Sequence, residues 1–259
     1  MRTDNNWNLQ TSSYWRCLRV ALLLFAMQLC AVTHMMAEDR VVVSDLKINP
    51  GTTQTLAIQL ENAVPYSAFQ VEIYFPEGIS PVMTDGKYNV RLSSSRKTDK
   101  HSISANLVSD GGLKVLSYSF PNTSYSGTSG DLFEIDIVSE STFKGPASIV
   151  LKDAFFTRSS DRKELLFADT HCVAFITPYV IGDADGDHQR TFSDAVAVVN
   201  YVMGSPSQNF NSTLANVTGD FDEHAKPKVT VTDAVRIILM LNGDASAPKQ
   251  DMKEPEVEP

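Results

Sequence analysis

The sequence of 259 residues predicts a mainly β fold class, in which a β-sandwich is followed by a small helical module. The first observation is alternation: apolar and polar side chains alternate over residues 69–75, as expected for a strand with one buried face. The second is a loop, residues 183–194, that leads into an apolar helical segment ending at Gly204. The third is repetition, because residues 191–204 recur as residues 230–243.

Residues 1–37 are predicted to be a signal peptide. Arg16 and Arg19 precede an apolar stretch, 20–32, that is too short to span a bilayer, and Ala37 offers a cleavage site. A lipoprotein is disfavoured, because the bulky Leu29 precedes Cys30 where a small residue is needed. We therefore expect a protein that is secreted or at the cell surface, with no transmembrane segment once the signal is removed.

The composition argues against a nucleic-acid partner and against an intramolecular disulfide. The chain carries 31 Asp and Glu against 22 Lys and Arg, a formal net charge of −9, which argues against a nucleic-acid partner. Two of the three Cys lie in the signal peptide, so Cys172 has no partner for an intramolecular disulfide. We expect Cys172 to be a buried strand residue and the fold to be held by its core and by metal.

Residues 38–178 are predicted to form the sandwich, with a tight turn at 110–112. The inward positions of the alternating strand are Phe69, Val71, Ile73 and Phe75. The outward positions are Gln70, Glu72 and Tyr74. Further strands are expected at 40–48, 55–61, 88–92, 102–108, 113–120, 132–138, 147–156 and 171–176. Many short strands separated by Gly, Pro and Ser favour a sandwich or barrel.

The two repeats are predicted to be calcium loops. Ca²⁺ takes six to eight oxygen ligands, which alternate positions of one loop can supply. The ligands expected in the first loop are Asp183, Asp185, Asp187, Gln189, Thr191 and Asp194. Those expected in the second loop are Asp220, Asp222, His224, Thr230 and Asp233. Two departures weaken the pattern: His188 replaces the usual Gly at position six, and an insertion around 225–228 brings Lys226 and Lys228 into the second loop. We expect Ca²⁺ in the first loop and leave a degenerate, empty second loop as an alternative.

Each loop is expected to lead into a helix with one apolar stripe. The first stripe is Val196, Val199, Val202 and Met203. The second is Val235, Ile238, Leu239 and Leu241. Neither short helix can hide its stripe alone, so we expect the two stripes to pack in a shared seam.

The duplicated loop and helix resemble a type I dockerin. The matching residues are Gly182-Asp-x-Asp-Gly-Asp187 with Phe192-Ser-Asp-Ala-Val196, and Gly219-Asp-x-Asp222 with Val231-Thr-Asp-Ala-Val235. Residues 64–79 and 126–137 resemble strands of cohesin-like and related carbohydrate-binding β-sandwiches. The resemblance implies a cohesin-like sandwich of jelly-roll type at 38–178 and a dockerin-like module with two calcium loops at 179–243. The combination resembles secreted and surface proteins of Bacteroidetes.

The connecting segments differ in character. Residues 177–182 are short, and Tyr179, Val180 and Ile181 are apolar for a linker, so we expect them to pack between the two parts. Residues 244–259 are rich in Pro, Lys, Glu and Asp and are predicted to be a disordered tail.

No catalytic residue is expected, because no pair of carboxylates, nucleophile motif or phosphate loop is recognisable. The His residues lack the paired spacing of a zinc site. The predicted function is a non-catalytic, calcium-binding interaction module whose protein partner is a cohesin-like sandwich, either its own or that of another protein. The alternative is a carbohydrate-binding accessory protein of a polysaccharide-degrading system. That alternative would use exposed aromatic side chains, for which Tyr74, Tyr118 and Tyr125 are candidates; Phe120 is expected in the core.

Overall fold

The computed structural model describes residues 39–243. The expected signal peptide at 1–37 and the expected tail at 244–259 lie outside the described residues. Between residues 39 and 243 no helix has the length and apolar character needed to cross a bilayer.

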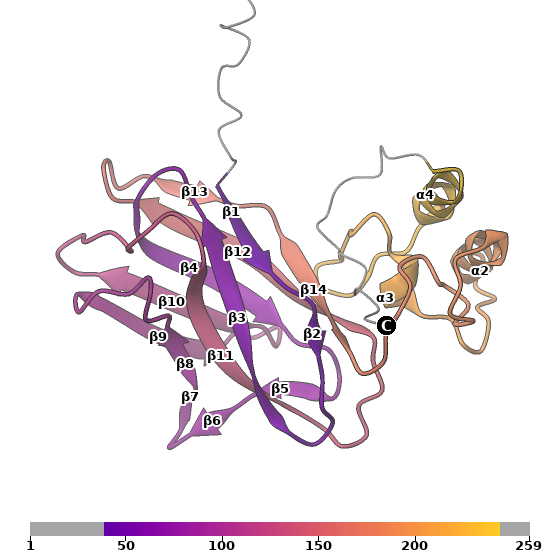
Figure 1. Ribbon diagram of the computed structural model, residues 1–259, viewed down its shortest axis with the longest axis horizontal. Coiled ribbons are helices and arrows are strands. Elements are labelled where there is room, and N and C mark those ends of the chain that lie inside the picture. The colour runs from indigo at the N-terminus through magenta and orange to yellow at the C-terminus, as the bar shows by residue number, and fades with distance from the viewer. Residues whose placement is uncertain (1–38, 244–259) are drawn as a thin grey trace, which may run out of the picture. The chain divides into compact units, whose positions relative to one another are not determined.

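Two β-sheets make up most of the described chain (Figure 1). One sheet has the order β1-β3-β11-β5, with β8 also paired to β11. Its strands are β1 (Arg40–Val43), β3 (Thr53–Glu61), β5 (Ile79–Pro81), β8 (Val90–Leu92) and β11 (Asp131–Ser139). The pairs in this sheet are antiparallel, so neighbouring strands need only short connections.

The larger sheet has the order β2-β14-β12-β4-β10-β9, with β13 also paired to β12. Its strands are β2 (Leu46–Lys47), β4 (Tyr66–Tyr74), β9 (His101–Leu107), β10 (Leu113–Ser119), β12 (Ala147–Arg158), β13 (Glu164–Leu166) and β14 (Thr170–Phe175). The pair β2–β14 is parallel and joins the two ends of the sandwich sequence. A separate hairpin pairs β6 (Met83–Thr84) with β7 (Lys87–Tyr88).

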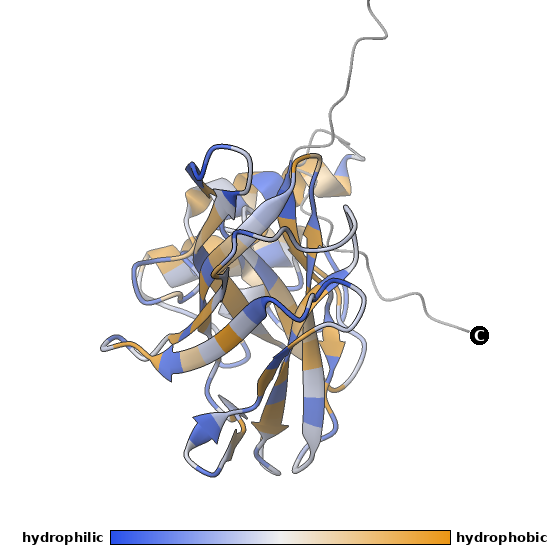
Figure 2. Cartoon of the chain, turned by 90° about the vertical axis from the view of Figure 1, so that its left-hand side faces the viewer, coloured by the Kyte–Doolittle hydropathy of each residue, from blue (hydrophilic) through white to orange (hydrophobic). Residues whose placement is uncertain are grey.

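The sandwich core lies between the two sheets. Phe69 of β4 stacks on Phe133 of β11, with 4.9 Å between ring centroids, and on Phe156 of β12 at 5.6 Å. Because Phe133 belongs to one sheet and Phe69 and Phe156 to the other, one aromatic stack joins the two layers. Hydrophobic segments follow the strands in Figure 2, whereas several of the loops that connect them are hydrophilic.

The mainly β fold class is confirmed, and every segment expected to be a strand contains at least part of one. The strands that sequence reasoning missed are β5, β6 and β13, each of three residues or fewer. Period-two alternation cannot be recognised over so short a stretch. Cys172 is buried as expected, and burial raises the pKa of its thiol.

Two expectations about aromatic and outward residues are wrong. Phe120 was expected in the core but is 95% exposed, since it lies one residue beyond the end of β10. Glu72 and Tyr74 occupy outward positions of β4 but are buried. The Tyr74 hydroxyl donates to Asp110 at 2.7 Å, and a Cβ on Gly112 would lie only 2.8 Å from the Tyr74 ring. The 110–112 turn therefore closes over part of the outer face of β4.

The C-terminal module contains α2 (Phe192–Val202), α3 (Ser212–Ala215) and α4 (Val231–Leu241). The two long helices pack against each other, but the predicted stripes are only partly right. The buried apolar residues of α2 are Ala195, Ala197 and Val198, and those of α4 are Ala234 and Ile237. Val196, Val202, Met203 and Val235 are exposed, while Val199, Ile238 and Leu241 are partly buried against the module core. The seam is shared as expected, yet it combines Val198 and Ile237 with the small side chains of Ala195, Ala197 and Ala234.

The join between sandwich and module is packed, as predicted. Tyr179 and Ile181 are buried in the module core, which also includes Val173 of β14. Asp45 accepts hydrogen bonds from the Val173 N–H and from the Tyr179 hydroxyl. These contacts fix the position of the segment that connects β14 to the module.

Candidate functional site

The first loop brings three of its predicted ligands together. One carboxylate oxygen from each of Asp183, Asp185 and Asp187 lies within 4.8 Å of the others. Asp183 is buried, whereas Asp187 is exposed at the loop surface. Among residues 39–243 this is the cluster of carboxylates that could hold a metal ion.

The backbone folds around Asp183. Its Oδ1 accepts hydrogen bonds from the N–H of Gly186 at 2.8 Å and of Asp187 at 3.0 Å, and its Oδ2 accepts from the N–H of His188 at 3.0 Å. Gly186 and His188 both have left-handed φ angles, 79° and 66°. His188 therefore adopts the turn that a Gly would adopt without strain.

Asp194 joins the loop to the helix. It is the N3 residue of α2 and forms a capping box with Thr191, whose N–H it accepts at 2.7 Å. Its other oxygen accepts from the N–H groups of Ala184 at 2.7 Å and Asp185 at 3.2 Å. Gln189 is exposed and donates its N–H to Asp187 at 2.8 Å. The six predicted residues of the first loop thus belong to one hydrogen-bonded turn.

Charge is unfavourable in this turn without a counterion. Burial raises the pKa of Asp183, and the nearby Asp194 carboxylate raises it further against the backbone donors. Burial also raises the pKa of Asp185, together with the carboxylates of Asp194 and Asp187. Binding of a hard cation such as Ca²⁺ would offset this repulsion.

The second loop keeps the helix-capping arrangement of the first loop but not its cluster of carboxylates. Asp233 is the N3 residue of α4 and forms the same capping box, with Thr230. Its remaining oxygen accepts from the N–H and hydroxyl of Thr218, at 3.0 and 2.8 Å, rather than from residues of the loop. Ala225 has a φ of 57°, at the place where the first loop has His188.

The other predicted ligands of the second loop do not converge. Asp222 accepts the N–H groups of His224 and Lys226, both at 2.9 Å. Asp220 is exposed, and its N–H donates to Asn216 at 3.2 Å. Within the described residues, Asp220, Asp222, His224 and Asp233 form no cluster comparable to that of the first loop.

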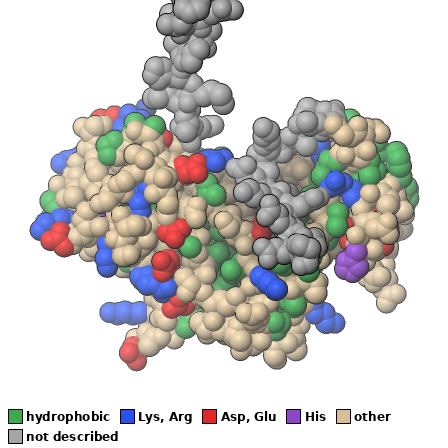
Figure 3. All heavy atoms as spheres, in the orientation of Figure 1, with side chains coloured by type: hydrophobic (Ala, Val, Ile, Leu, Met, Phe, Trp, Pro, Cys, Tyr) green, Lys and Arg blue, Asp and Glu red, His purple; other side chains and the backbone are tan. Residues whose placement is uncertain are grey.

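A pair of exposed apolar side chains occupies equivalent positions in the two helices. Phe192 and Val196 of α2 are 62% and 58% exposed, and the corresponding Val231 and Val235 of α4 are 53% and 51% exposed. We call these four residues the helix surface. Hydrophobic side chains are visible on this part of the module in Figure 3. Sequence reasoning assigned Val196 and Val235 to the buried seam, so it missed this surface.

The aromatic residues considered for sugar binding do not form one surface. Tyr74 and Tyr125 are buried, while Tyr118 is 44% exposed and Phe120 is 95% exposed. The structure therefore leaves two of these aromatic side chains accessible.

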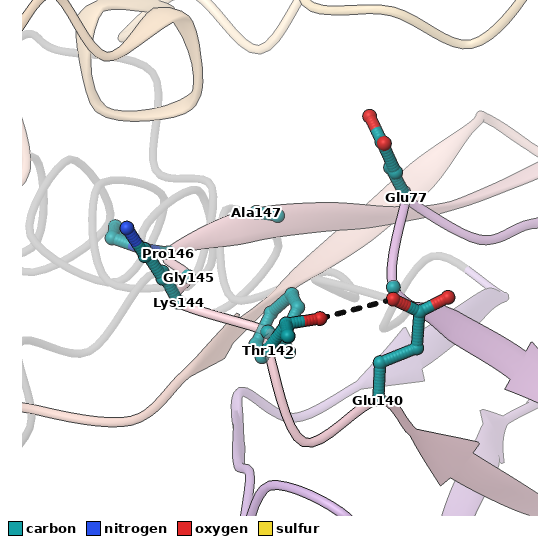
Figure 4. Close-up of a pocket in the computed structure, with 9 residues that line it drawn as sticks. Glu77, Glu140, Thr142, Lys144, Gly145, Pro146 and Ala147 are labelled. Atoms are coloured by element: carbon teal, nitrogen blue, oxygen red, sulfur yellow. Dashed lines mark hydrogen bonds between the residues drawn. The ribbon is translucent and has the colours of Figure 1, made fainter.

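An open hollow of about 370 Å³ lies beside the start of β12 (Figure 4). Its lining includes Glu77, Glu140 and Lys144. The Thr142 hydroxyl donates to Glu140 at 3.2 Å, and Glu77 points away from this pair (Figure 4). No arrangement of acid, base and nucleophile is present in this lining, and we assign it no function.

Comparison with known proteins gives structural similarity alone. No protein-family model matches the chain. No curated protein matches it either. A type I cohesin–dockerin complex from Clostridium thermocellum is 15% identical, with a TM-score of 0.42, covering 53% of this chain and 99% of that chain. The non-cellulosomal cohesin from Archaeoglobus fulgidus is 15% identical, with a TM-score of 0.41, covering 53% and 91%.

A type I cohesin from Pseudobacteroides cellulosolvens is 16% identical, with a TM-score of 0.40, covering 54% of this chain and 93% of that chain. The solved structures similar to this chain thus include cohesins, the family that the sandwich sequence resembles. Because the identities and TM-scores are low, we base the functional proposal on the residues of this chain.

Proposed function

We propose that this chain is a non-catalytic interaction protein, exported to the cell surface or beyond, whose dockerin-like module binds a cohesin-like β-sandwich of another protein. The helix surface carries this proposal. Phe192 and Val196 repeat as Val231 and Val235, and all four side chains are more than half exposed. Exposed apolar groups at matched positions are typical of a docking site, because water contact at each one is unfavourable until a partner covers it.

The first loop supports the same proposal by fixing the start of α2. Asp183, Asp185, Asp187 and Asp194 would hold Ca²⁺ through carboxylate oxygens, with Gln189 and Thr191 adding oxygens at the remaining positions. The bound ion would supply the positive charge that the clustered carboxylates lack. Because Asp194 caps α2 and also contacts Ala184 and Asp185, loss of the loop would release the helix that carries Phe192 and Val196.

The test is capture of a partner from the secreted fraction of the source organism, followed by titration with that purified partner. We expect a protein containing a β-sandwich, bound in calcium and released by chelator. Val196→Asp/Val235→Asp should weaken binding at least about tenfold, since each change places a charge at the interface. The matched control is Glu223→Ala, at an exposed position outside the helix surface. Equal affinity of the double variant and the control would refute the proposal.

Carbohydrate binding is a second candidate, and the exposed Tyr118 and Phe120 favour it. It has less support, because Tyr74 and Tyr125, the other two aromatic residues considered, are buried. A glycan array with the protein and with Tyr118→Ala/Phe120→Ala separates the two functions. Glycan binding that disappears in this variant and persists in Val196→Asp/Val235→Asp would establish the second candidate.

A further inference from the structure

The second loop contacts the outer face of the larger sheet. The Ala225 side chain is 9% exposed and packs in a cluster with Tyr74 of β4 and Val150 of β12, against which Phe221 is also packed. This cluster is separate from the sandwich core and from the module core. It is formed jointly by the loop and the sheet. We call it the second-loop contact.

Polar and aromatic contacts surround these apolar groups. Lys152 of β12 donates its Nζ proton to the Asp222 carbonyl at 3.0 Å, and the same Nζ lies 6.0 Å from the Tyr74 ring centroid. The His171 ring of β14 meets the Phe221 ring edge to face, with 4.9 Å between centroids. Side chains from three neighbouring strands, β4, β12 and β14, therefore hold one loop.

The loop closes through its own backbone. The N–H of Asp222 donates to the Lys226 carbonyl at 3.0 Å, and the N–H of Lys228 donates to the Asp220 carbonyl at 2.9 Å. Phe221 and Pro227 form an isolated β-bridge across the loop. One oxygen of Asp222 accepts the N–H groups of His224 and Lys226. These contacts join residues 220–224 to the inserted segment around 225–228, so the second loop is closed by hydrogen bonds rather than around an ion.

We propose that the second loop is an intramolecular binding element that takes no metal ion and attaches the module to this chain's own sandwich. Asp233 is turned to Thr218, Asp222 closes the turn, and Ala225 occupies an apolar cluster. The first loop and the second loop then have different tasks: one orders a helix with Ca²⁺, and the other holds the module in place without it. This proposal rests on the proposed function for the role of the first loop.

The first test is stoichiometry, by calorimetric titration of the protein with Ca²⁺ after chelator treatment. We expect one ion per chain. Asp220→Ala should leave the titration unchanged, whereas Asp183→Ala/Asp185→Ala should abolish it. Two ions per chain, with one lost in Asp220→Ala, would overturn the proposal. Absence of any bound ion would count against the calcium role of the first loop and not against the second-loop contact.

The second test is hydrogen exchange of residues 72–75 and 149–152 in calcium-free buffer. We expect protection of these segments to persist in the unmodified protein. Ala225→Arg should accelerate exchange there, because a large charged side chain cannot enter the cluster, and Glu223→Arg, exposed on the same loop, should not. Equal exchange in the two variants would overturn the proposal, as would loss of protection on chelation alone. No partner protein is involved, so this outcome is independent of the helix surface.

A third measurement covers the case in which Ala225→Arg fails to fold. His171→Gln and Phe221→Leu are milder changes on the two sides of the contact. The decrease in melting temperature of the double variant should be smaller than the sum of the decreases of the two single variants, because the two residues are in contact. Simple additivity would show that Phe221 and His171 are not coupled and would refute the contact.

Discussion

Arg96 is the largest fully buried side chain of the described protein, at 1% exposure. Its Nη2 donates to the Asn62 side-chain oxygen at 2.6 Å, and its Nη1 donates to the Leu60 carbonyl at 3.4 Å. Burial lowers the pKa of the guanidinium. Within the described residues Arg96 forms no ion pair with a carboxylate. Its positive charge is therefore stabilised by hydrogen bonds to neutral oxygens.

Asn62→Ala should therefore destabilise the sandwich. The change leaves a buried guanidinium without its shortest hydrogen bond, at a cost of about 1.5–3 kcal/mol in the free energy of unfolding. Urea denaturation followed by far-UV circular dichroism measures this loss. Asn106→Ala, at an exposed position of β9, is the control and should change stability by less than about 0.5 kcal/mol. Equal effects of the two changes would contradict the role assigned to Asn62.

His101 gives a pH dependence of stability. Its ring stacks on Tyr125 with 4.1 Å between centroids, and burial lowers its pKa against a smaller opposing effect of the Thr123 backbone. Because the pKa is lower in the folded state, the unfolded chain binds the proton more readily below about pH 6.5. Stability should thus fall as pH decreases through that range.

The measurement is thermal unfolding between pH 5 and 7.5. His101→Phe keeps the stacked ring without the titrating group and should show a smaller decrease on acidification than the unmodified protein. His224→Gln, exposed on the second loop, should keep the full decrease. An unchanged pH slope in His101→Phe would show that another group is responsible.

The sequence does not predict the environment of a residue that is buried by a distant segment of the chain. The burial of Cys172 follows from a local pattern, which is why the sequence predicts it. Asp194 and Asp233 were expected only as calcium ligands, and their capping of α2 and α4 is a finding of the structure. The burial of Tyr74 depends on the 110–112 turn and on Ala225, far from it in the chain. Alternation within one strand carries no information about what covers the outer face of a sheet.

At the scale of elements, the two helices differ from expectation in which face they bury. Helical spacing predicted Val196, Val202 and Met203 in the buried seam, but these side chains are exposed. The buried seam instead centres on Val198 and Ile237, both at 0% exposure, with Ala195 and Ala234 beside them. Helical spacing alone therefore does not show which apolar side chains of a short helix are buried.

Ile237→Asp should unfold both repeats. Ile237 has 0% exposure in the module core, so a carboxylate there costs several kcal/mol, more than a small module can tolerate. Hydrogen exchange should show loss of protection in α2 as well as α4. Val235→Asp on the exposed side of α4 should leave both helices protected. Persistent protection of α2 in Ile237→Asp would mean that the helices do not stabilise each other.

At the scale of the whole molecule, sandwich and module are predicted to respond differently to calcium. The sandwich core contains no residue of the first loop, whereas α2 begins at that loop. Chelation should lower the melting temperature of the module and leave that of the sandwich unchanged. A ligand at about 100 times its dissociation constant contributes roughly 2.7 kcal/mol to the folded state.

Scanning calorimetry with calcium and with chelator tests this expectation. Asp183→Ala/Asp185→Ala should reproduce the chelated profile in the presence of calcium, and Asp220→Ala should not. A single transition that shifts as one unit on chelation would contradict the separation of the two parts.

The contacts of Asp45 have a consequence for the order of folding. Asp45 lies at the beginning of the described chain, and its partner Tyr179 follows 134 residues later. The neighbouring strand β2 likewise pairs with β14, the last strand of the sandwich. The larger sheet therefore cannot be completed until synthesis has passed residue 175, and closing so long a loop makes folding slow. If the chain is exported as proposed, it would reach the export channel before the larger sheet is complete, in the extended state that a narrow channel requires.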